Sequence, residues 1–123
     1  MPIINVVGTT CPPEMEERFR KWYDEKHIPE LMNYKGLKKV TRYNIVGAAK
    51  GVPGVNLLSV KVGGQEYPKF LTIYEFDDLQ AFEGYDNSPD MATARKDWFK
   101  VKEEIGAEIV WRVQFESVKV WQR

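Results

Sequence analysis

The sequence has few of the residues that usually carry metal or disulfide chemistry. Among its 123 residues there is one cysteine and one histidine. A single cysteine cannot form a disulfide within the chain, which is typical of proteins from a reducing cytoplasm. Transition-metal sites gather three or four histidine, cysteine or carboxylate ligands at tight spacing, and the carboxylates of this chain are scattered. We therefore expect no metal site and a cytoplasmic location.

The chain also lacks an excess of charge of either sign. Its 18 basic and 18 acidic residues give a formal net charge of +0 at pH 7. Without a basic face, nucleic acid is a poor partner. No apolar run approaches the ~18 residues that a membrane span needs, and the first residues lack the charged start and the long apolar stretch of a signal peptide. Partners other than nucleic acid or a membrane are expected.

Aromatic side chains, by contrast, are abundant. The chain holds 4 tryptophans, 6 tyrosines and 6 phenylalanines. Its length predicts one domain, over residues 1–123, with enough buried surface for a real core. The aromatic residues fit either a plain core or a pocket for a flat apolar ligand.

Strand and helix patterns alternate along the chain. Strand patterns cover residues 3–9, 36–46, 70–76 and 109–115. One helix pattern follows Pro13, which suits a first helical position. A second follows Asp77, a predicted N-cap, and is interrupted at Ser88, where another N-cap precedes Pro89. Residues 47–66 form a glycine-rich insert between the second and third strands, and it fits a β-ribbon, a lid or a dimer contact.

This order predicts an α+β fold of the ferredoxin-like type, in which a split β-α-β antiparallel sheet carries two helices on one face. The strands are apolar on both faces, so one apolar face is left without helices. In the last strand we expect one apolar side: Ile109, Trp111, Val113 and Phe115. An uncovered apolar face needs a partner. We therefore expect a homodimer that packs sheet against sheet, with a partner also covering Trp121 near the end of the chain.

The first helix carries the only histidine at the end of an apolar stripe. The members of that stripe are Met15, Phe19, Trp22 and Tyr23. His27 follows Tyr23 by four residues. Pro29 cannot donate a hydrogen bond and biases Ile28 away from helical angles, so the helix should end or kink near His27, with a short second turn after Pro29. His27 is then either at the mouth of a pocket or a half-buried structural histidine.

Two further polar residues bear on this site. Asn5 lies on a predicted central strand, where an unpaired buried amide costs ~1–3 kcal/mol. The Asn5 amide would be satisfied equally well by facing a water-filled pocket or by a hydrogen bond to a neighbouring element. Cys11 lies just before the first helix, where a thiol can be acidified. Roughly 20 Å of helix separates it from His27, so we expect no Cys–His pair and an unreactive thiol.

The order of elements, the length and the motif W-Y-x-x-x-H-x-P, formed by Trp22, Tyr23, His27 and Pro29, resemble the dimeric α/β-barrel superfamily and, within it, the EthD-like branch. The resemblance covers nearly the whole chain, and only the first-helix motif is distinctive. It implies a homodimer with a pocket between helices and sheet in each subunit. The superfamily includes cofactor-free monooxygenases, lactone isomerases, polyketide cyclases and haem-degrading enzymes. No second histidine exists to supply a haem-degrading site.

This resemblance implies a function. We expect a small cofactor-independent enzyme that carries out isomerisation, cyclisation or oxygenation on a small apolar cyclic or aromatic molecule. His27, with an unperturbed pKa near 6.5, would move a proton next to a carbonyl. Tyr23 and Tyr74 would orient the substrate or donate to the developing oxyanion. The expected substrate-binding residues are Asn5, Trp22, Phe70 and Trp98. The alternative is a non-catalytic ligand-binding or assembly module of the same fold.

Overall fold

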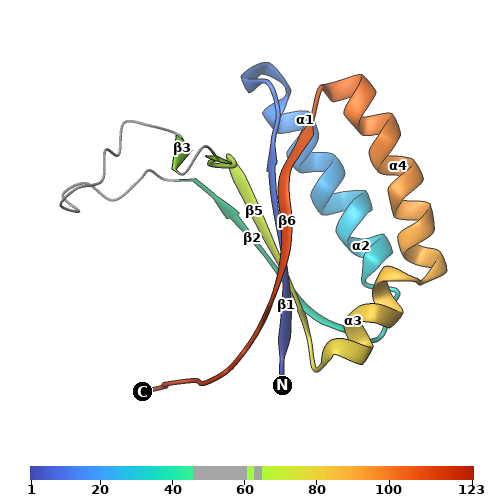
Figure 1. Cartoon of the computed structure of the whole chain (residues 1–123). Coiled ribbons are helices and arrows are strands. Elements are labelled where there is room, and N and C mark those ends of the chain that lie inside the picture. The colour runs from blue at the N-terminus through green and yellow to red at the C-terminus, as the bar shows by residue number, and fades with distance from the viewer. Residues whose placement is uncertain (46–60, 63–64) are drawn as a thin grey trace.

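A four-stranded antiparallel sheet forms the centre of the protein, whose computed structural model describes residues 1–45, 61–62 and 65–123. The strands are β1 (Ile3–Thr10), β2 (Leu37–Asn44), β5 (Phe70–Phe76) and β6 (Glu108–Glu116). Their order across the sheet is β2-β5-β1-β6, with every neighbouring pair antiparallel. The helices lie on one side of the sheet (Figure 1). The predicted ferredoxin-like arrangement is confirmed, and β1 and β5 are its central strands.

The helical layer consists of two long runs. Their segments are η1 (Pro13–Met15), α1 (Glu16–Trp22), η2 (Tyr23–His27), α2 (Ile28–Leu31), α3 (Leu79–Asp86) and α4 (Pro89–Ile105). Within the predicted insert, β3 (Lys61–Val62) pairs antiparallel with β4 (Gln65–Glu66). The other residues of that insert lie outside the described part of the chain. The lid and dimer-contact interpretations concern those residues and stay predictions. No helix among residues 1–45, 61–62 and 65–123 is long and apolar enough to cross a membrane.

The helix through His27 does not end where the sequence predicts an end or a kink, but its turn widens there. Ile28 keeps helical angles, with φ −64° and ψ −47°, and its N–H bonds to the carbonyl of Tyr23, five residues back. Tyr23–His27 form a wider π-type turn, in which each N–H bonds to the carbonyl five residues back and not four. This change comes just before Pro29, whose ring would clash with the preceding turn of a regular α-helix. The second turn after Pro29 is confirmed as α2, but the expected loss of helical angles at Ile28 was wrong.

Polar side chains cap the second helical run. The Ser88 hydroxyl accepts a bond from the Met91 N–H at 3.1 Å and donates to the Tyr85 carbonyl at 2.8 Å, which confirms the predicted N-cap of α4. The predicted cap at Asp77 is wrong by one residue. Asp78 caps α3 instead, accepting from the Ala81 N–H at 2.8 Å.

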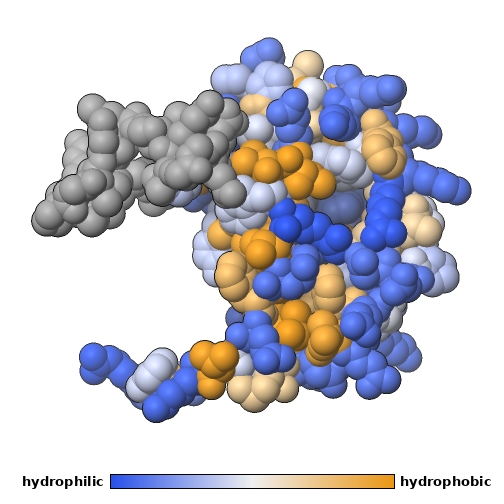
Figure 2. All heavy atoms as spheres, viewed as in Figure 1, coloured by the Kyte–Doolittle hydropathy of each residue, from blue (hydrophilic) through white to orange (hydrophobic). Residues whose placement is uncertain are grey.

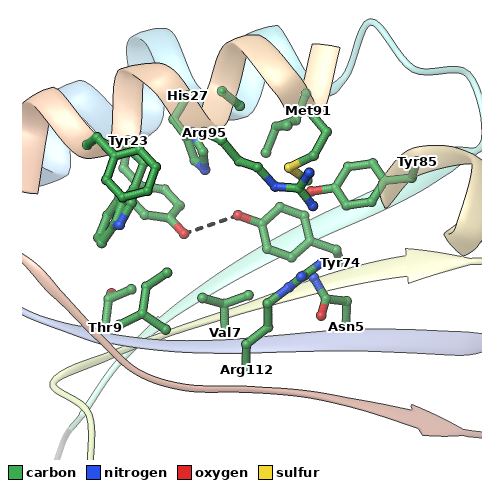
Figure 3. A pocket seen from close by; sticks show the side chains of 15 residues that line it. Asn5, Val7, Thr9, Tyr23, His27, Tyr74, Tyr85, Met91, Arg95 and Arg112 are labelled. Carbon is green, nitrogen blue, oxygen red and sulfur yellow. Dashed lines mark hydrogen bonds between the residues drawn. The ribbon is translucent and has the colours of Figure 1, made fainter. Parts of the chain in front are cut away.

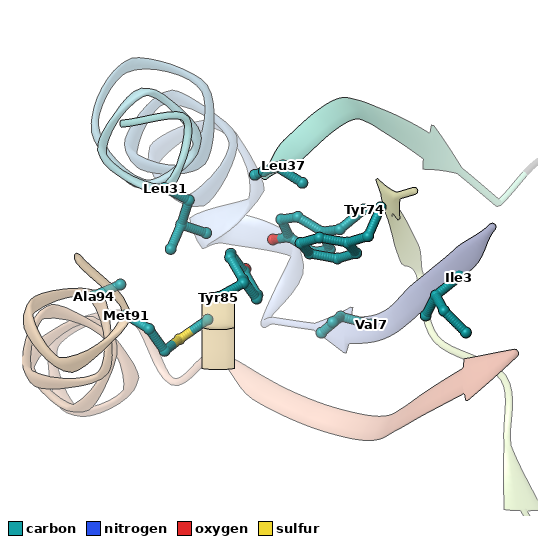
Figure 4. Packing of buried hydrophobic residues seen from close by; sticks show 9 residues of the cluster. Ile3, Val7, Leu31, Leu37, Tyr74, Tyr85, Met91 and Ala94 are labelled. Carbon is teal, nitrogen blue, oxygen red and sulfur yellow. The ribbon is translucent and has the colours of Figure 1, made fainter. Parts of the chain in front are cut away.

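The core lies between the helices and the helix-facing side of the sheet. The helix-facing side chains of β5 are all buried: Phe70, Thr72, Tyr74 and Phe76. Tyr74 packs with Leu31 of α2, Tyr85 of α3 and Met91 of α4 in one apolar cluster (Figure 4). A second cluster forms around Phe19 towards the start of the first helix. Aromatic rings thus join both helical runs to the central strands.

Strand β6 turns its polar side towards the helices. Gln114 pairs with Asn5 in the sheet and donates to its side-chain oxygen at 2.8 Å. Because side chains alternate, Val113 and Phe115 lie on the opposite face, where they are 37% and 55% exposed. An irregularity in the pairing between Gly8 and Thr9 places Ile109 opposite Thr9 and on the helix side. The prediction that Ile109 shares a face with Phe115 was therefore wrong.

The last residues leave the sheet without forming a helix or strand (Figures 1 and 2). Val118, Val120 and Trp121 are 84%, 71% and 79% exposed. Together with Val113 and Phe115 they leave apolar side chains uncovered outside the helix-covered core.

The Ser88 cap gives a stability prediction. We expect Ser88→Ala to lower the free energy of unfolding by about 1 kcal/mol, because the first turn of α4 loses its side-chain acceptor. Urea denaturation monitored by circular dichroism measures the change. Thr93→Ala is the matched control. It also removes a hydroxyl of α4 that bonds to a backbone carbonyl, but its site is exposed and caps no helix end. Equal losses in the two variants would contradict the capping role.

Candidate functional site

A cavity of ≈ 320 Å³ lies between the helices and the sheet. It is bounded by η2 and α2 of the first helical run, by α3 and α4 of the second, and by β1, β5 and β6 below them (Figure 3). Of the predicted site residues, the cavity is lined by Asn5, Tyr23, His27, Tyr74 and Trp98. Residues from four separate stretches of the sequence thus meet at one place.

Trp22 and Phe70, also expected as walls, do not line the cavity. The indole of Trp22 stacks on the His27 ring with centroids 4.7 Å apart and an interplanar angle of 22°. Phe70 packs against Phe19 with ring centroids 5.9 Å apart. Both belong to the apolar cluster around Phe19, where Phe70 is buried and Trp22 packs against the buried members. They therefore support the residues that do reach the cavity.

His27 contributes a neutral imidazole to the wall. Its ring packs between Trp22 and the edge of Tyr23, 4.8 Å from the Tyr23 centroid. Burial lowers the pKa of His27 to about 4, Asp97 opposes this shift, and Arg42 adds to it. Nδ1 is buried and has no hydrogen-bond partner in the described structure. The pKa thus departs from the unperturbed value that the sequence predicts.

A pair of tyrosine hydroxyls lies on the same cavity. The Tyr23 and Tyr74 oxygens are 3.1 Å apart and share a hydrogen bond. Burial raises the pKa of Tyr74 well above its ordinary value, so the phenol keeps its proton. Two hydroxyls carry two protons and their mutual bond uses one, so one O–H stays available to a ligand.

Polar groups of β1 complete the floor. Asn5 is 1% exposed, and it both accepts the bond from Gln114 and lines the cavity, so the two solutions that the sequence allows occur together. Thr9, also 1% exposed, lines the cavity and its hydroxyl oxygen has no partner in the described structure. The Thr9 oxygen thus keeps a hydrogen-bonding capacity that the protein leaves unused.

Two arginines at the cavity were not predicted. Arg95 of α4 and Arg112 of β6 line it, and both donate to Asp86 Oδ1, at 3.0 and 2.8 Å. Arg112 alternates with apolar residues along its strand, and this alternation is the one sequence pattern that could have indicated a role for it. Sequence alone assigned the apolar side of β6 without showing that the polar side faces the helices.

Metal and thiol chemistry find little support in the described part of the chain. No three histidine, cysteine, aspartate or glutamate side chains gather there closely enough to hold a metal ion. Cys11 is buried, and burial raises the pKa of its thiol, with Glu16 adding to the shift. It is not an activated nucleophile.

The sheet order, the single helical layer and the pocket between them define a ferredoxin-like protein with the fold of the dimeric α/β-barrel superfamily. The chain belongs to the family described as Domain of unknown function (DUF4286), whose model matches residues 1–103. No curated protein sequence matches this chain.

Solved structures share this fold at low sequence identity. An ethyl tert-butyl ether degradation (EthD) family protein from Bacillus halodurans is 16% identical with a TM-score of 0.62, over 94% of this chain and 99% of that one. A dimeric protein of unknown function and ferredoxin-like fold from Bacteroides fragilis is 16% identical with a TM-score of 0.56, over 94% and 96%. A candidate antibiotic biosynthesis monooxygenase from Deinococcus radiodurans is 12% identical with a TM-score of 0.59, over 100% and 98%.

The neutral state of His27 gives a direct prediction. Because His27 is the sole histidine, its imidazole Cε1–H signal in proton NMR is unambiguous. We expect a titration midpoint at about 4 in the folded protein, because burial disfavours the imidazolium. Asp97→Asn should lower the midpoint further, since Asp97 favours the charged form. A folded-state midpoint near 6.5 would show that the ring is solvated and would contradict the site.

The same shift predicts a pH dependence of stability. The folded pKa of about 4 lies below the ordinary 6.5, so between these values the unfolded chain binds the proton more readily. The contribution of neutral His27 is therefore fully present above pH 6.5 and lost as the pH falls towards 4, amounting to at most about 3 kcal/mol. Denaturant unfolding at several pH values should show a flatter acid slope for His27→Gln than for the wild type.

Proposed function

We propose that the protein is a small cofactor-independent enzyme that uses His27 for acid/base chemistry on a small, largely apolar cyclic or aromatic molecule. The observation that carries this proposal is the His27 imidazole, kept neutral by burial, on the wall of a cavity of ≈ 320 Å³ that the Tyr23–Tyr74 pair also lines. The pocket is neither filled by its own side chains nor lined by apolar groups alone.

The low pKa of His27 limits which substrate protons it can remove. A neutral imidazole accepts a proton without first losing one, but a pKa of about 4 makes it a weak base. It suits an acidic proton, such as a C–H next to a carbonyl in a ring or a phenolic O–H. A negative charge that develops on the substrate beside the ring raises the imidazole pKa and assists the transfer.

The tyrosine pair supplies the matching oxyanion contact. The O–H left over from the Tyr23–Tyr74 bond donates to the oxygen on which charge accumulates, and the Asn5 amide is the second candidate partner. Trp98 provides a flat wall for the ring of the substrate. Isomerisation and cyclisation both start from proton removal next to a carbonyl, and oxygenation starts from the same electron-rich anion.

A non-catalytic ligand-binding or assembly module is the second candidate. The low basicity of His27 favours it, because a binding site needs only the hydrogen-bonding capacity of the ring. Both candidates require a small ligand in the same cavity, so they differ only in whether a proton moves.

We also propose that two copies of the chain pack sheet against sheet. The apolar side of β6 points away from the helices, and the apolar tail residues around Trp121 are uncovered. Contiguous exposed apolar patches mark sites where a protein binds a partner, a membrane or a ligand, and a second copy of the chain is the partner proposed here. The structurally similar protein from Bacteroides fragilis is described as dimeric, which supports a pair of chains here.

Exchange of acidic C–H protons tests the chemistry. 2-Tetralone is a ring ketone whose α-protons exchange slowly in D2O, and NMR follows their loss. We expect the wild-type protein to accelerate this exchange and His27→Gln to reduce the acceleration by about 100-fold or more, the usual contribution of a general base. Tyr74→Phe should reduce it by a smaller factor, because the Tyr23 hydroxyl keeps one free O–H but loses the neighbour that positions it.

Lys21→Gln, an exposed change on α1, is the control for the effect of mutation itself. Acceleration that persists in His27→Gln would contradict the role of the imidazole. No acceleration by a folded wild-type protein would favour the non-catalytic module.

The dimer has its own test. Phe115→Asp places a charge on the uncovered sheet face, so we expect it to shift the molar mass in light scattering from that of two chains to that of one. Leu79→Asp is the matched control, since Leu79 is also exposed, at 52%, but lies on α3 and away from that face. A wild-type protein that elutes as one chain, or a Phe115→Asp variant that stays paired, would refute the interface.

A further inference from the structure

We propose that the mouth of the cavity binds a carboxylate, so that the ligand is a ring compound carrying one acid group. Arg95 and Arg112 come from α4 and β6, and both line the cavity. Their guanidinium groups converge on a single oxygen of Asp86, at 3.0 and 2.8 Å, which holds them side by side. Figure 3 shows the Arg95 guanidinium near Tyr85 and the Arg112 guanidinium near Asn5, both away from the Tyr23 hydroxyl.

The charges at this point do not cancel. Two guanidinium groups face one carboxylate, which leaves one positive charge. None of the residues that line the cavity in the described structure is an aspartate or glutamate. Each guanidinium has five N–H donors, and one bond from each to Asp86 leaves donors free. A single carboxylate balances the remaining charge and takes up such donors in a fork.

The number of charges also selects among anions. A carboxylate brings one negative charge and makes the site neutral. A phosphate monoester brings nearly two at neutral pH and leaves an excess negative charge beside Asp86. The site is therefore matched to a carboxylate and not to a phosphate.

The rest of the cavity fixes what the acid is attached to. Leu31, Met91 and Trp98 add apolar groups to the lining of the cavity. The Tyr23–Tyr74 pair and His27 line the same cavity. The ligand class is therefore a ring with a carboxylate at one end and a carbonyl or hydroxyl at the other. The assignment of the reacting end to His27 rests on the proposed function, whereas the carboxylate site does not.

Paired probes test the carboxylate site. 2-Naphthoate and 2-naphthamide have the same ring and differ in charge, and titration calorimetry at low salt and neutral pH gives both affinities. We expect the wild type to bind the acid about tenfold more tightly than the amide, the factor that one partly exposed charge-assisted bond gives. Arg112→Gln should reduce this preference to about onefold, and Arg95→Gln should act in the same direction.

Arg18→Gln is the matched control. It removes one positive charge from an exposed ion pair with Glu104 on the outer surface of the helices, so the acid preference should stay. Thermal melting shows whether each variant folds. If Arg112→Gln does not fold, Arg95→Gln carries the test, because the Arg95 side chain is 51% exposed.

Several results would overturn the carboxylate site. They are equal affinities for acid and amide, no binding of either probe, a preference that survives both arginine changes, or tighter binding of 2-naphthyl phosphate than of 2-naphthoate. The outcome is separable from that of the proposed function. If the acid preference depends on the arginines but His27→Gln exchanges protons as fast as the wild type, the proposed chemistry is refuted and the carboxylate site is kept. If His27→Gln loses the exchange activity but the acid preference does not depend on the arginines, the chemistry is kept and the carboxylate site is refuted.

Discussion

Burial of polar atoms without protein partners is the constraint on which this site depends. His27 Nδ1 and the Thr9 hydroxyl are both enclosed and unpaired in the described structure, and both belong to residues of the same cavity. Each such atom costs about 1–3 kcal/mol when nothing bonds to it. The rings of Trp22 and Tyr23 on either side keep the imidazole in place despite this cost. Stability is given up in this region, and the packing around the cavity must offset it.

Much of the fold was accessible from the sequence because it depends on short-range patterns. The alternation in residues 70–76 predicts β5 with its correct bounds and faces, and the order of elements then leaves few arrangements for the sheet. Placement of His27 beside Tyr23 follows from helical spacing within one turn. Asn5 and Trp98 required the fold as well, since they come from a strand and from the second helical run.

The features of the site that the sequence does not predict depend on contacts between residues far apart in the chain. The pairing irregularity beside Gly8 turns Ile109 towards the helices, and the polar side of β6 brings Arg112 into contact with Asp86. Neither event leaves a local signature. The pKa of His27 depends on how completely neighbouring elements enclose it, which no spacing reports. Trp22 is expected as a wall of the pocket, but its ring stacks on His27 instead.

The wide turn at Tyr23–His27 is equivalent to one residue inserted into an ordinary helix. An extra residue that is taken up by a wide turn leaves the helix on either side in regular geometry. Each residue from Ile28 onwards therefore lies one position later in the sequence than regular α-helical spacing from the stripe of α1 predicts. A relative lacking one residue here would continue with an ordinary α-helical turn, and its counterpart of Leu31 would still reach the cavity that Leu31 now lines.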